Sequence, residues 1–295
     1  MIDYLATKKI GVAYLQNSGL GNALNPLISI ADKRVYSIPM LLLIGWRGAP
    51  GLKDEPQHMS KGKITLPILK NLNIKFVELK NKNDFSKLNS LIKHGNKKKL
   101  PVAILIKKNT FEKEKSLKKN KSNYLNRSYF LKEILKVINK NDFLISSTGY
   151  THREIYELRK RYNLYKGKDF YMVGGMGHTA GVALGSSIAK KNNRTICIDG
   201  DGSLLMHMGS LATVGNYGKK NFKYILLNNH AHESVGNQPT NSHNINFSLF
   251  AKSVGFKNYN LIKNQKNFSS KILNFLNKDN IVFLIFFYLR YFFAA

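Results

Sequence analysis

Residues 195–229 read TICIDGDGSLLMHMGSLATVGNYGKKNFKYILLNN, with two short apolar runs that each end in polar residues. The runs are Thr195–Ile198 and Lys223–Leu227, and the 25 residues between Gly202 and Asn228 leave room for one crossover helix. We therefore expect two neighbouring parallel strands. Because ligands bind at the carboxyl ends of strands in such sheets, the polar residues after both runs are candidates for one site.

The polar residues suit a magnesium ion that carries a diphosphate. Asp201 and Asn229 offer the hard oxygen ligands that Mg²⁺ prefers. Glycines at 200 and 202 let the backbone approach phosphates, and Ser203 with the following helix start offers donors. Gly-Asp-Gly alone is a common turn, and paired asparagines are expected in a chain rich in asparagine. The spacing of both elements on adjacent strands favours the magnesium diphosphate site.

The remaining sequence predicts two α/β domains. The expected strands are Ile10–Leu15, Pro39–Ile44, Lys75–Leu79, Val102–Ile106, Phe143–Ser146, Thr195–Ile198, Tyr224–Leu227 and Ile281–Phe286. The expected helices are a stretch ending at Ile30, Thr65–Leu72, Phe85–His94, one around Tyr129–Val137, Ala180–Lys190, Leu205–Gly215 and Phe268–Leu276. We predict domains over 1–110 and 129–295, joined by a basic linker over 111–128, and a doubly wound parallel sheet in each domain.

Composition limits the classes of partner. Lys and Arg number 47 and Asp and Glu 17, which gives a formal charge of +30. The lysines are spread along the chain without a recognisable nucleic-acid module, so we expect no specific nucleic acid, only nonspecific adhesion to polyanions at low salt. Cys197 is the single cysteine, which excludes an internal disulfide and a cysteine zinc site and fits a cytoplasmic protein. The apolar run Ile281–Leu289 is too short to cross a bilayer, so we expect no membrane partner.

Longer motifs resemble one enzyme family, the phosphonopyruvate decarboxylases, whose near relatives are the sulfopyruvate decarboxylases. The motifs are QNSGLGNALNPL from Gln16, IPMLLLIGWRGAPGLKDEPQH from Ile38, TGYTHREIYELR from Thr148, VGGMGHTAGVALG from Val173, DGDGSLLMHMGSLATVG from Asp199 and LLNNHAHESVGNQPT from Leu226. The resemblance implies two domains of the thiamine diphosphate-binding type, with thiamine diphosphate and Mg²⁺ as cofactors. It also implies a 2-oxo acid substrate and a homo-oligomer, at least a dimer, because the family's sites lie between subunits.

The resemblance assigns roles to residues of the second domain. Asp201, Asn229 and the carbonyl of Ala231 match the family's Mg²⁺ ligands. Met176 resembles the bulky residue that holds the cofactor bent, with simple core packing as the alternative. Gly174 is the candidate backbone acceptor for the cofactor's amine. The full set of expected cofactor-binding residues is Thr148, Gly149, Gly174, Met176, Gly200, Gly202, Ser203 and Asn228.

Other residues are candidates for substrate binding and proton transfer. Arg47 can bind a phosphonate or sulfonate bidentately. The expected substrate-binding set is Arg47 with Asn17, Ser18 and His58, and Gln57 could supplement it. His232 and Glu233 could transfer protons, with a solvated loop as the alternative. For Trp46 and Asp54 we favour packing and loop-fixing roles, and His178 and His207 are equally compatible with structural roles.

The two ends depart from the family pattern. In the family, a strand, a helix and a second strand precede the Gln-Asn-Ser-Gly loop and carry the glutamate that contacts the aminopyrimidine ring. Here 15 residues precede Gln16, and Asp3 is the only acid among them. We therefore expect an incomplete first domain. At the other end, Phe287–Phe293 is an apolar segment without an evident partner.

Three functions remain open. The first is thiamine diphosphate- and Mg²⁺-dependent decarboxylation of 3-phosphonopyruvate to phosphonoacetaldehyde and CO₂, impaired by the truncation. The second is decarboxylation of sulfopyruvate or another 2-oxo acid, because an anion pocket alone does not separate phosphonate from sulfonate. The third is a catalytically inactive, cofactor-binding remnant that assembles with a partner supplying the lost glutamate.

Overall fold

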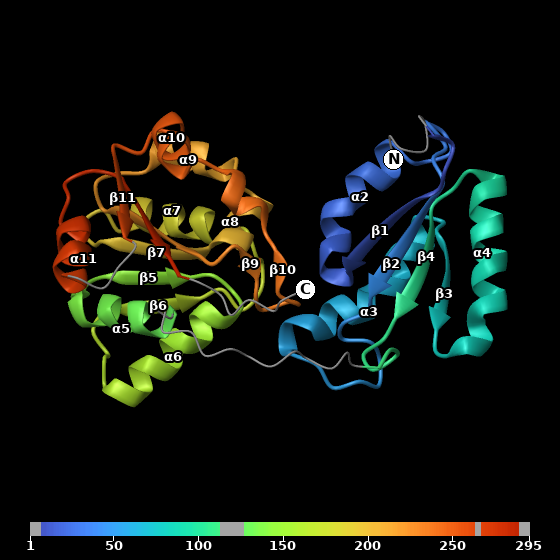
Figure 1. Ribbon diagram of the computed structural model, residues 1–295, viewed down its shortest axis with the longest axis horizontal. Helices are drawn as coiled ribbons and strands as arrows, with labels where there is room; N and C mark the ends of the chain where they lie inside the picture. Colours follow the sequence, from blue (N-terminus) through green and yellow to red (C-terminus); the bar gives the residue numbers. More distant parts are fainter. Residues whose placement is uncertain (1–6, 113–126, 263–266, 289–295) are drawn as a thin grey trace. The chain divides into compact units, whose positions relative to one another are not determined.

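The chain folds into two compact units, Met1–Ser116 and Leu117–Ala295 (Figure 1). The computed structural model describes residues 7–112, 127–262 and 267–288. The division between the units falls within the expected linker 111–128, most of which lies outside the described residues. The apolar segment expected over Phe287–Phe293 also lies largely outside them.

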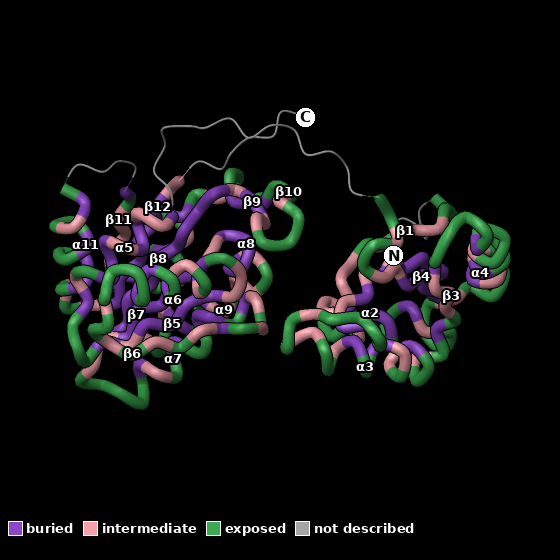
Figure 2. Tube along the Cα trace, turned by 90° about the horizontal axis from the view of Figure 1, so that it is seen from below, coloured by how far each residue is buried: buried purple, intermediate pink, exposed green. Residues whose placement is uncertain are grey.

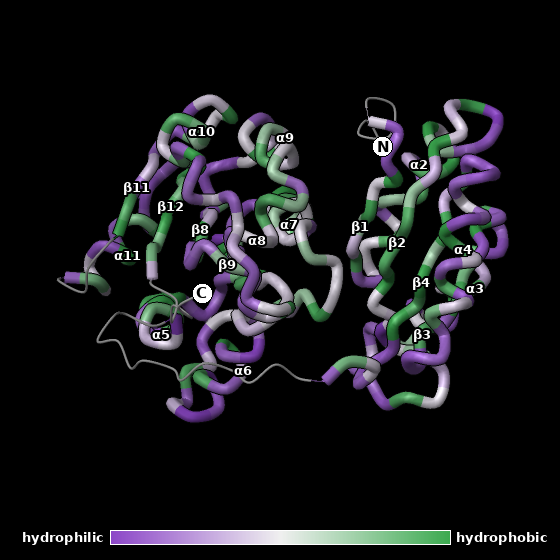
Figure 3. The backbone as a smooth tube through the Cα atoms, turned by 45° about the vertical axis from the view of Figure 1, so that its right-hand side comes forward, coloured by the Kyte–Doolittle hydropathy of each residue, from purple (hydrophilic) through white to green (hydrophobic). Residues whose placement is uncertain are grey.

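The first unit contains a four-stranded parallel sheet in the order β1-β2-β4-β3. Its elements are β1 (Gly11–Gln16), η1 (Asn17–Gly19), α2 (Leu20–Ser29), β2 (Met40–Gly45), α3 (Pro56–Asn71), β3 (Lys75–Leu79), η2 (Lys82–Asp84), α4 (Phe85–Lys98) and β4 (Val102–Ile106). Side chains alternate between two layers: Leu42 and Ile44 pack with α2 and α3, whereas Leu41 and Ile104 pack with α4. The green colour of β2 and β4 in Figure 3 reflects this burial on both faces.

The second unit contains a six-stranded parallel sheet in the order β11-β12-β8-β7-β5-β6. Its strands are β5 (Phe143–Ser146), β6 (Lys168–Tyr171), β7 (Thr195–Gly200), β8 (Phe222–Asn228), β11 (Asn258–Ile262) and β12 (Val282–Phe287). Its helices are α5 (Arg127–Val137), α6 (Tyr150–Tyr162), α7 (Thr179–Ala189), α8 (Asp201–Met206), α9 (Ser210–Tyr217), η3 (Asn241–Asn244), α10 (Phe247–Ser253) and α11 (Phe268–Leu276). A short antiparallel pair, β9 (Ala231–His232) and β10 (Gln238–Pro239), follows β8.

Two separate apolar layers cover this sheet. Ile196, Ile198 and Leu284 pack against α5, α6 and α11, whereas Cys197 and Ile285 face α7, α9 and α10. The strands β7 and β8 are accordingly buried along nearly all their length, as the purple tube in Figure 2 shows. The predicted doubly wound α/β fold is confirmed.

The order of the strands creates a switch point in the second unit. From β5 the chain proceeds to β6 on one side, then returns to β7 on the other side. The loops after β5 and β7 therefore leave in opposite directions and open a crevice at the carboxyl ends of these strands, where such sheets bind ligands.

Several expected elements have the predicted bounds and others are corrected. The strands over 75–79, 102–106 and 143–146 and the helix over 268–276 match. The helix expected over 65–72 begins earlier, at Pro56, because proline suits a first helical position. The single helix expected over 205–215 is two helices, α8 and α9, separated at 207–209. Among the described residues, no helix is long and apolar enough to cross a membrane.

Candidate functional site

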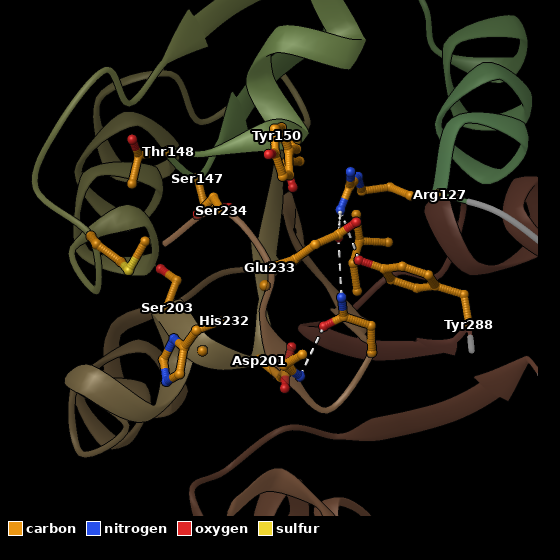
Figure 4. Close-up of a pocket in the computed structure, with 17 residues that line it drawn as sticks. Arg127, Ser147, Thr148, Tyr150, Asp201, Ser203, His232, Glu233, Ser234 and Tyr288 are labelled. Carbon is orange, nitrogen blue, oxygen red and sulfur yellow. Dashed lines mark hydrogen bonds and ion pairs between the residues drawn. The ribbon is translucent and has the colours of Figure 1, made fainter. Parts of the chain in front are cut away.

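A cavity lies at the switch point, at the carboxyl ends of β5, β7 and β8 (Figure 4). It is lined by Arg127, Ser147, Thr148, Tyr150, Thr151, Met176, Gly200, Asp201, Gly202, Ser203, Leu227, Asn229, Ala231, His232, Glu233, Ser234 and Tyr288. The structure thus brings the expected metal residues, both expected proton-transfer residues and most of the expected cofactor residues into one place. Gly149, Gly174 and Asn228 do not line the cavity.

Asp201 is the first residue of α8 and is almost completely buried. Its Oδ2 accepts hydrogen bonds from Thr240 Oγ1 at 2.5 Å and from Ser242 Oγ at 3.0 Å. No donor among the described residues contacts its Oδ1. One carboxylate oxygen is therefore fixed by hydroxyls, which leaves the other available to a cation.

Asn229 and Ala231 supply the other two expected ligand oxygens. Asn229 Oδ1 accepts from the backbone N of Ala231 at 3.1 Å, which uses one of its two lone pairs. Ala231 faces Pro239 across the β9–β10 pair, and proline has no N–H to bond the Ala231 carbonyl. The described residues contain no group of three or more His, Cys, Asp or Glu arranged to hold a metal. One carboxylate, one amide and one carbonyl nevertheless form a donor set that fits Mg²⁺, which keeps waters and phosphate oxygens as further ligands.

Gly200 and Gly202 differ in the space that a side chain would have. A Cβ at Gly200 would meet nothing within 4 Å, so its backbone is open to a ligand. A Cβ at Gly202 would lie 2.4 Å from Nδ1 of His232. The imidazole of His232 occupies the space that a side chain at position 202 would need, and the expected contact of Gly202 with the cofactor stays a prediction.

Ser203 and Asn228 serve the loops around the cavity. Ser203 Oγ accepts from the backbone N of Gly177 at 3.0 Å, which ties the Met176 loop to α8. Asn228 is fully buried, and its Oδ1 accepts from His230 N and Ser242 Oγ, each at 3.0 Å. These contacts support the loop after β8, and the expected contact of Asn228 with the cofactor stays a prediction.

Asp199, to which the sequence motifs gave no role, lies in β7 directly before Gly200. It is fully buried and accepts from Tyr224 Oη and from the backbone N of Gly200, each at 3.0 Å. Burial raises the pKa of Asp199 to about 6, although these hydrogen bonds oppose the shift.

A buried arginine, Arg127, also lines the cavity, and no sequence motif predicted it. Arg127 donates to Glu233 Oε2 at 2.6 Å, to Tyr288 Oη at 3.0 Å and to Glu154 Oε1 at 2.5 Å, and Figure 4 shows the Arg127, Glu233 and Tyr288 side chains converging. Burial alone would lower the pKa of Arg127, but these three neighbours outweigh it and raise the pKa. Glu233 is therefore an ion-paired group, which corrects the alternative of a solvated loop.

The expected substrate residues lie in the first unit, in one cluster around Arg47. The Arg47 guanidinium bonds both oxygens of Asp54, at 2.7 and 2.5 Å, and holds the pKa of Asp54 well below its usual range. Asp54 also accepts from the backbone N of Gly48 at 2.8 Å, and Trp46 Nε1 donates to the Gly62 carbonyl at 3.0 Å. The loop-fixing role expected of Asp54 and the packing role of Trp46 agree with these contacts.

The other expected substrate residues have internal partners or are partly buried. The Asn17 amide donates to the Arg47 carbonyl at 2.9 Å and accepts from the Arg47 N at 3.1 Å, so it holds the Arg47 loop. The expected contact of Asn17 with substrate stays a prediction. Ser18 Oγ donates to Gln16 Oε1 at 2.6 Å. His58 Nδ1 is buried without a hydrogen-bond partner, and burial, then the charge of Arg47, lowers the pKa of His58.

His178 and His207 lie outside the cavity. Their rings pack with centroids 4.3 Å apart and an interplanar angle of 53°. This contact agrees with structural roles for both residues.

Known proteins are similar to this chain in sequence. Residues 147–286 match the family described as thiamine pyrophosphate enzyme, C-terminal TPP binding domain. The sulfopyruvate decarboxylase subunit beta of Methanocaldococcus jannaschii is 31% identical over 163 residues, which are 55% of this chain and 83% of that protein. This chain belongs to the same family as that sulfopyruvate decarboxylase subunit beta.

Two longer proteins are also similar to this chain. The phosphonopyruvate decarboxylase of Streptomyces viridochromogenes is 32% identical over 269 residues, which are 84% of this chain and 65% of that protein. The phosphonopyruvate decarboxylase of Streptomyces hygroscopicus is 30% identical, with 84% and 64% covered. The chain thus spans just under two thirds of the length of these relatives. Its family match contains every expected cofactor and metal residue but neither Arg127 nor Tyr288.

Proposed function

We propose that the chain decarboxylates 3-phosphonopyruvate to phosphonoacetaldehyde with thiamine diphosphate and Mg²⁺. The observation that carries this proposal is that Asp201, Asn229 and Ala231, the three expected metal ligands, all line the switch-point cavity. Similarity to two phosphonopyruvate decarboxylases supports the substrate.

Several residues of the cavity have a role in the proposed reaction. When bound, thiamine diphosphate supplies the electron sink that decarboxylation of a 2-oxo acid requires. Asp201, Asn229 and Ala231 hold the cation, and the backbone at Gly200 offers an approach for the diphosphate. Met176 presents its side chain to the same cavity as an apolar support for the cofactor. His232, against Gly202, is the group available to move a proton.

Arg47 is the proposed recognition group for the phosphonate. Its Nε and one Nη are bonded to Asp54, so the guanidinium is oriented while its other Nη remains for an anion. The side chain is 38% exposed, which leaves it accessible.

Sulfopyruvate is the second candidate substrate. The observation in its favour is the similarity to a sulfopyruvate decarboxylase subunit beta, most of whose length this chain covers. A sulfonate would bind Arg47 as a phosphonate would. We also propose that the chain works in an assembly with at least one further subunit, because that relative is named as a subunit.

Release of CO₂ tests the function. The purified chain is incubated with phosphonopyruvate, sulfopyruvate or pyruvate, with and without thiamine diphosphate and Mg²⁺. We expect CO₂ only with both cofactors, and fastest from phosphonopyruvate. Faster release from sulfopyruvate would favour the second candidate. No cofactor-dependent release from any of the three acids would contradict the proposal.

A further inference from the structure

The hydrogen bonds of Asn229 lead from the proposed metal site to Arg127. Asn229 Nδ2 donates to Glu233 Oε2 at 3.2 Å, while Asn229 Oδ1 accepts from the Ala231 N at 3.1 Å. Arg127 Nη1 donates to the same Glu233 oxygen at 2.6 Å. Arg127, which is 106 positions away from Glu233 in sequence, is therefore connected through Glu233 to Asn229 by continuous hydrogen bonds (Figure 4).

These contacts give the Asn229 amide a single orientation. Rotated by 180°, its NH₂ group would face the Ala231 N–H and its oxygen would face the Glu233 carboxylate, so both hydrogen bonds would be lost. Only the observed orientation keeps the amide oxygen available as a ligand. Glu233 thus determines which atom of Asn229 a cation can reach.

Arg127 in turn fixes Glu233. The Arg127 residue is only 9% exposed, and its other Nη donates to Glu154 on α6 at 2.5 Å. Its guanidinium lies 5.5 Å from the ring centre of Tyr150 and 5.7 Å from that of Tyr288. The Glu233 side chain is 37% exposed, so without this rigid cation its carboxylate could turn toward water.

We propose that Arg127 and Glu233 are positioning residues that orient Asn229 for the divalent cation. The proposal rests on the proposed function and gives Glu233 a role other than proton transfer. Groups that orient metal ligands typically account for about 10- to 100-fold in metal affinity. The expected effect therefore falls on the cation, and it can be measured without turnover.

The test measures the Mg²⁺ concentration needed for half-maximal binding of thiamine diphosphate, by calorimetric titration. We expect Glu233→Ala and Arg127→Gln each to raise it by roughly 10-fold or more. The double variant with Glu233→Ala and Arg127→Gln should need little more Mg²⁺ than Glu233→Ala alone, because Arg127 acts on Asn229 only through Glu233. Glu233→Gln keeps an acceptor for Asn229 and should recover part of the affinity.

Arg194→Gln is the matched control. It breaks another ion pair with a mostly buried arginine, Arg194 with Asp142 at 2.6 Å, at the start of β7 and away from the cavity. We expect its Mg²⁺ requirement to be unchanged. Circular dichroism shows which variants fold. If Glu233→Ala does not fold, the Mg²⁺ requirement is compared in the single variants Arg127→Lys and Glu233→Gln.

The outcomes separate this inference from the proposed function. An unchanged Mg²⁺ requirement in folded Arg127 and Glu233 variants, or equal losses in Arg194→Gln, would overturn the positioning role alone. If the unaltered chain binds no thiamine diphosphate at any Mg²⁺ concentration, the proposed function and this inference both fail.

Discussion

Asp201 carries the proposed metal site, because it is the only carboxylate in the proposed ligand set. We expect Asp201→Ala to abolish Mg²⁺-dependent binding of thiamine diphosphate, since the diphosphate charge would lose most of its compensation. Calorimetric titration measures the affinity. Asp279→Ala removes a carboxylate that is 81% exposed and serves as the control. Unchanged affinity in Asp201→Ala would disprove the metal assignment.

Arg47 should determine which acid is used. We expect Arg47→Ala to reduce kcat/KM for phosphonopyruvate by roughly 10- to 100-fold, because a hydrogen bond to a charged group contributes about 1.5–3 kcal/mol. The loss for pyruvate, which has no phosphonate, should be small. Arg34→Ala, at a side chain that is 87% exposed, is the control. Equal losses on both acids would show that Arg47 only supports its loop.

Asp199 should give the stability of the chain a distinct pH dependence. Its pKa rises from 3.8 to about 6 on folding, so between these values the folded chain binds the proton and the unfolded chain does not. The stabilisation of the protonated form, about 3 kcal/mol, is therefore present below pH 4 and is lost as pH rises to 6. Asn cannot titrate, so Asp199→Asn should remove this slope from urea unfolding curves measured between pH 4 and 7. An identical slope in both proteins would contradict the assignment.

Local motifs predicted much of the cavity but not its surroundings. Asp201 and Asn229 could be paired from sequence because each directly follows a strand in the same sheet. Arg127 and Tyr288 could not, because no motif marks them and 161 positions separate them. Similarly, the hydroxyls of Thr240 and Ser242 reach Asp201 from 39 and 41 positions away. Such contacts depend on how the loops fold together, which residue spacing does not encode.

Two helical glycines should respond in opposite ways to alanine. Gly185, in α7, would place a Cβ in open space, so Gly185→Ala should stabilise the chain by about 0.5–1 kcal/mol. Gly215, in α9, would place a Cβ 1.4 Å from the Val254 carbonyl oxygen. Gly215→Ala should therefore destabilise it by about 1–3 kcal/mol or more. Urea unfolding of both variants checks the signs, and a stable Gly215→Ala would contradict the close packing of α9.

The elements most readily predicted are the buried central strands. Runs such as Val102–Ile106 and residues 143–145 are continuously apolar because helices cover both faces of the sheet. The strand β6 was not expected, because it is short, mostly polar and at the edge of the sheet. The first half of α3 was not expected either, because PQHMSKGK has little apolar periodicity. These segments receive their structure from the neighbours against which they pack.

The high net charge of the whole molecule should produce weak, nonspecific binding to polyanions. With a formal charge of +30, we expect adhesion to duplex DNA at about 50 mM salt and a loss of roughly 10³-fold in affinity by about 200 mM. Unrelated DNA sequences should behave alike, because the contacts are to phosphates. Fluorescence anisotropy with two labelled duplexes tests both statements. A strong preference for one duplex would contradict the expectation of no specific nucleic-acid partner.

The single tryptophan and the single cysteine lie in different units, and this placement provides two intrinsic probes. Trp46 is 5% exposed in the first unit, so its fluorescence reports the loss of that core alone. Cys197 is fully buried on β7, and burial raises the pKa of its thiol well above the usual value. An alkylating reagent should therefore modify it only when the second unit opens. Emission and labelling rates, followed in one unaltered sample, would show whether the two units unfold together or separately.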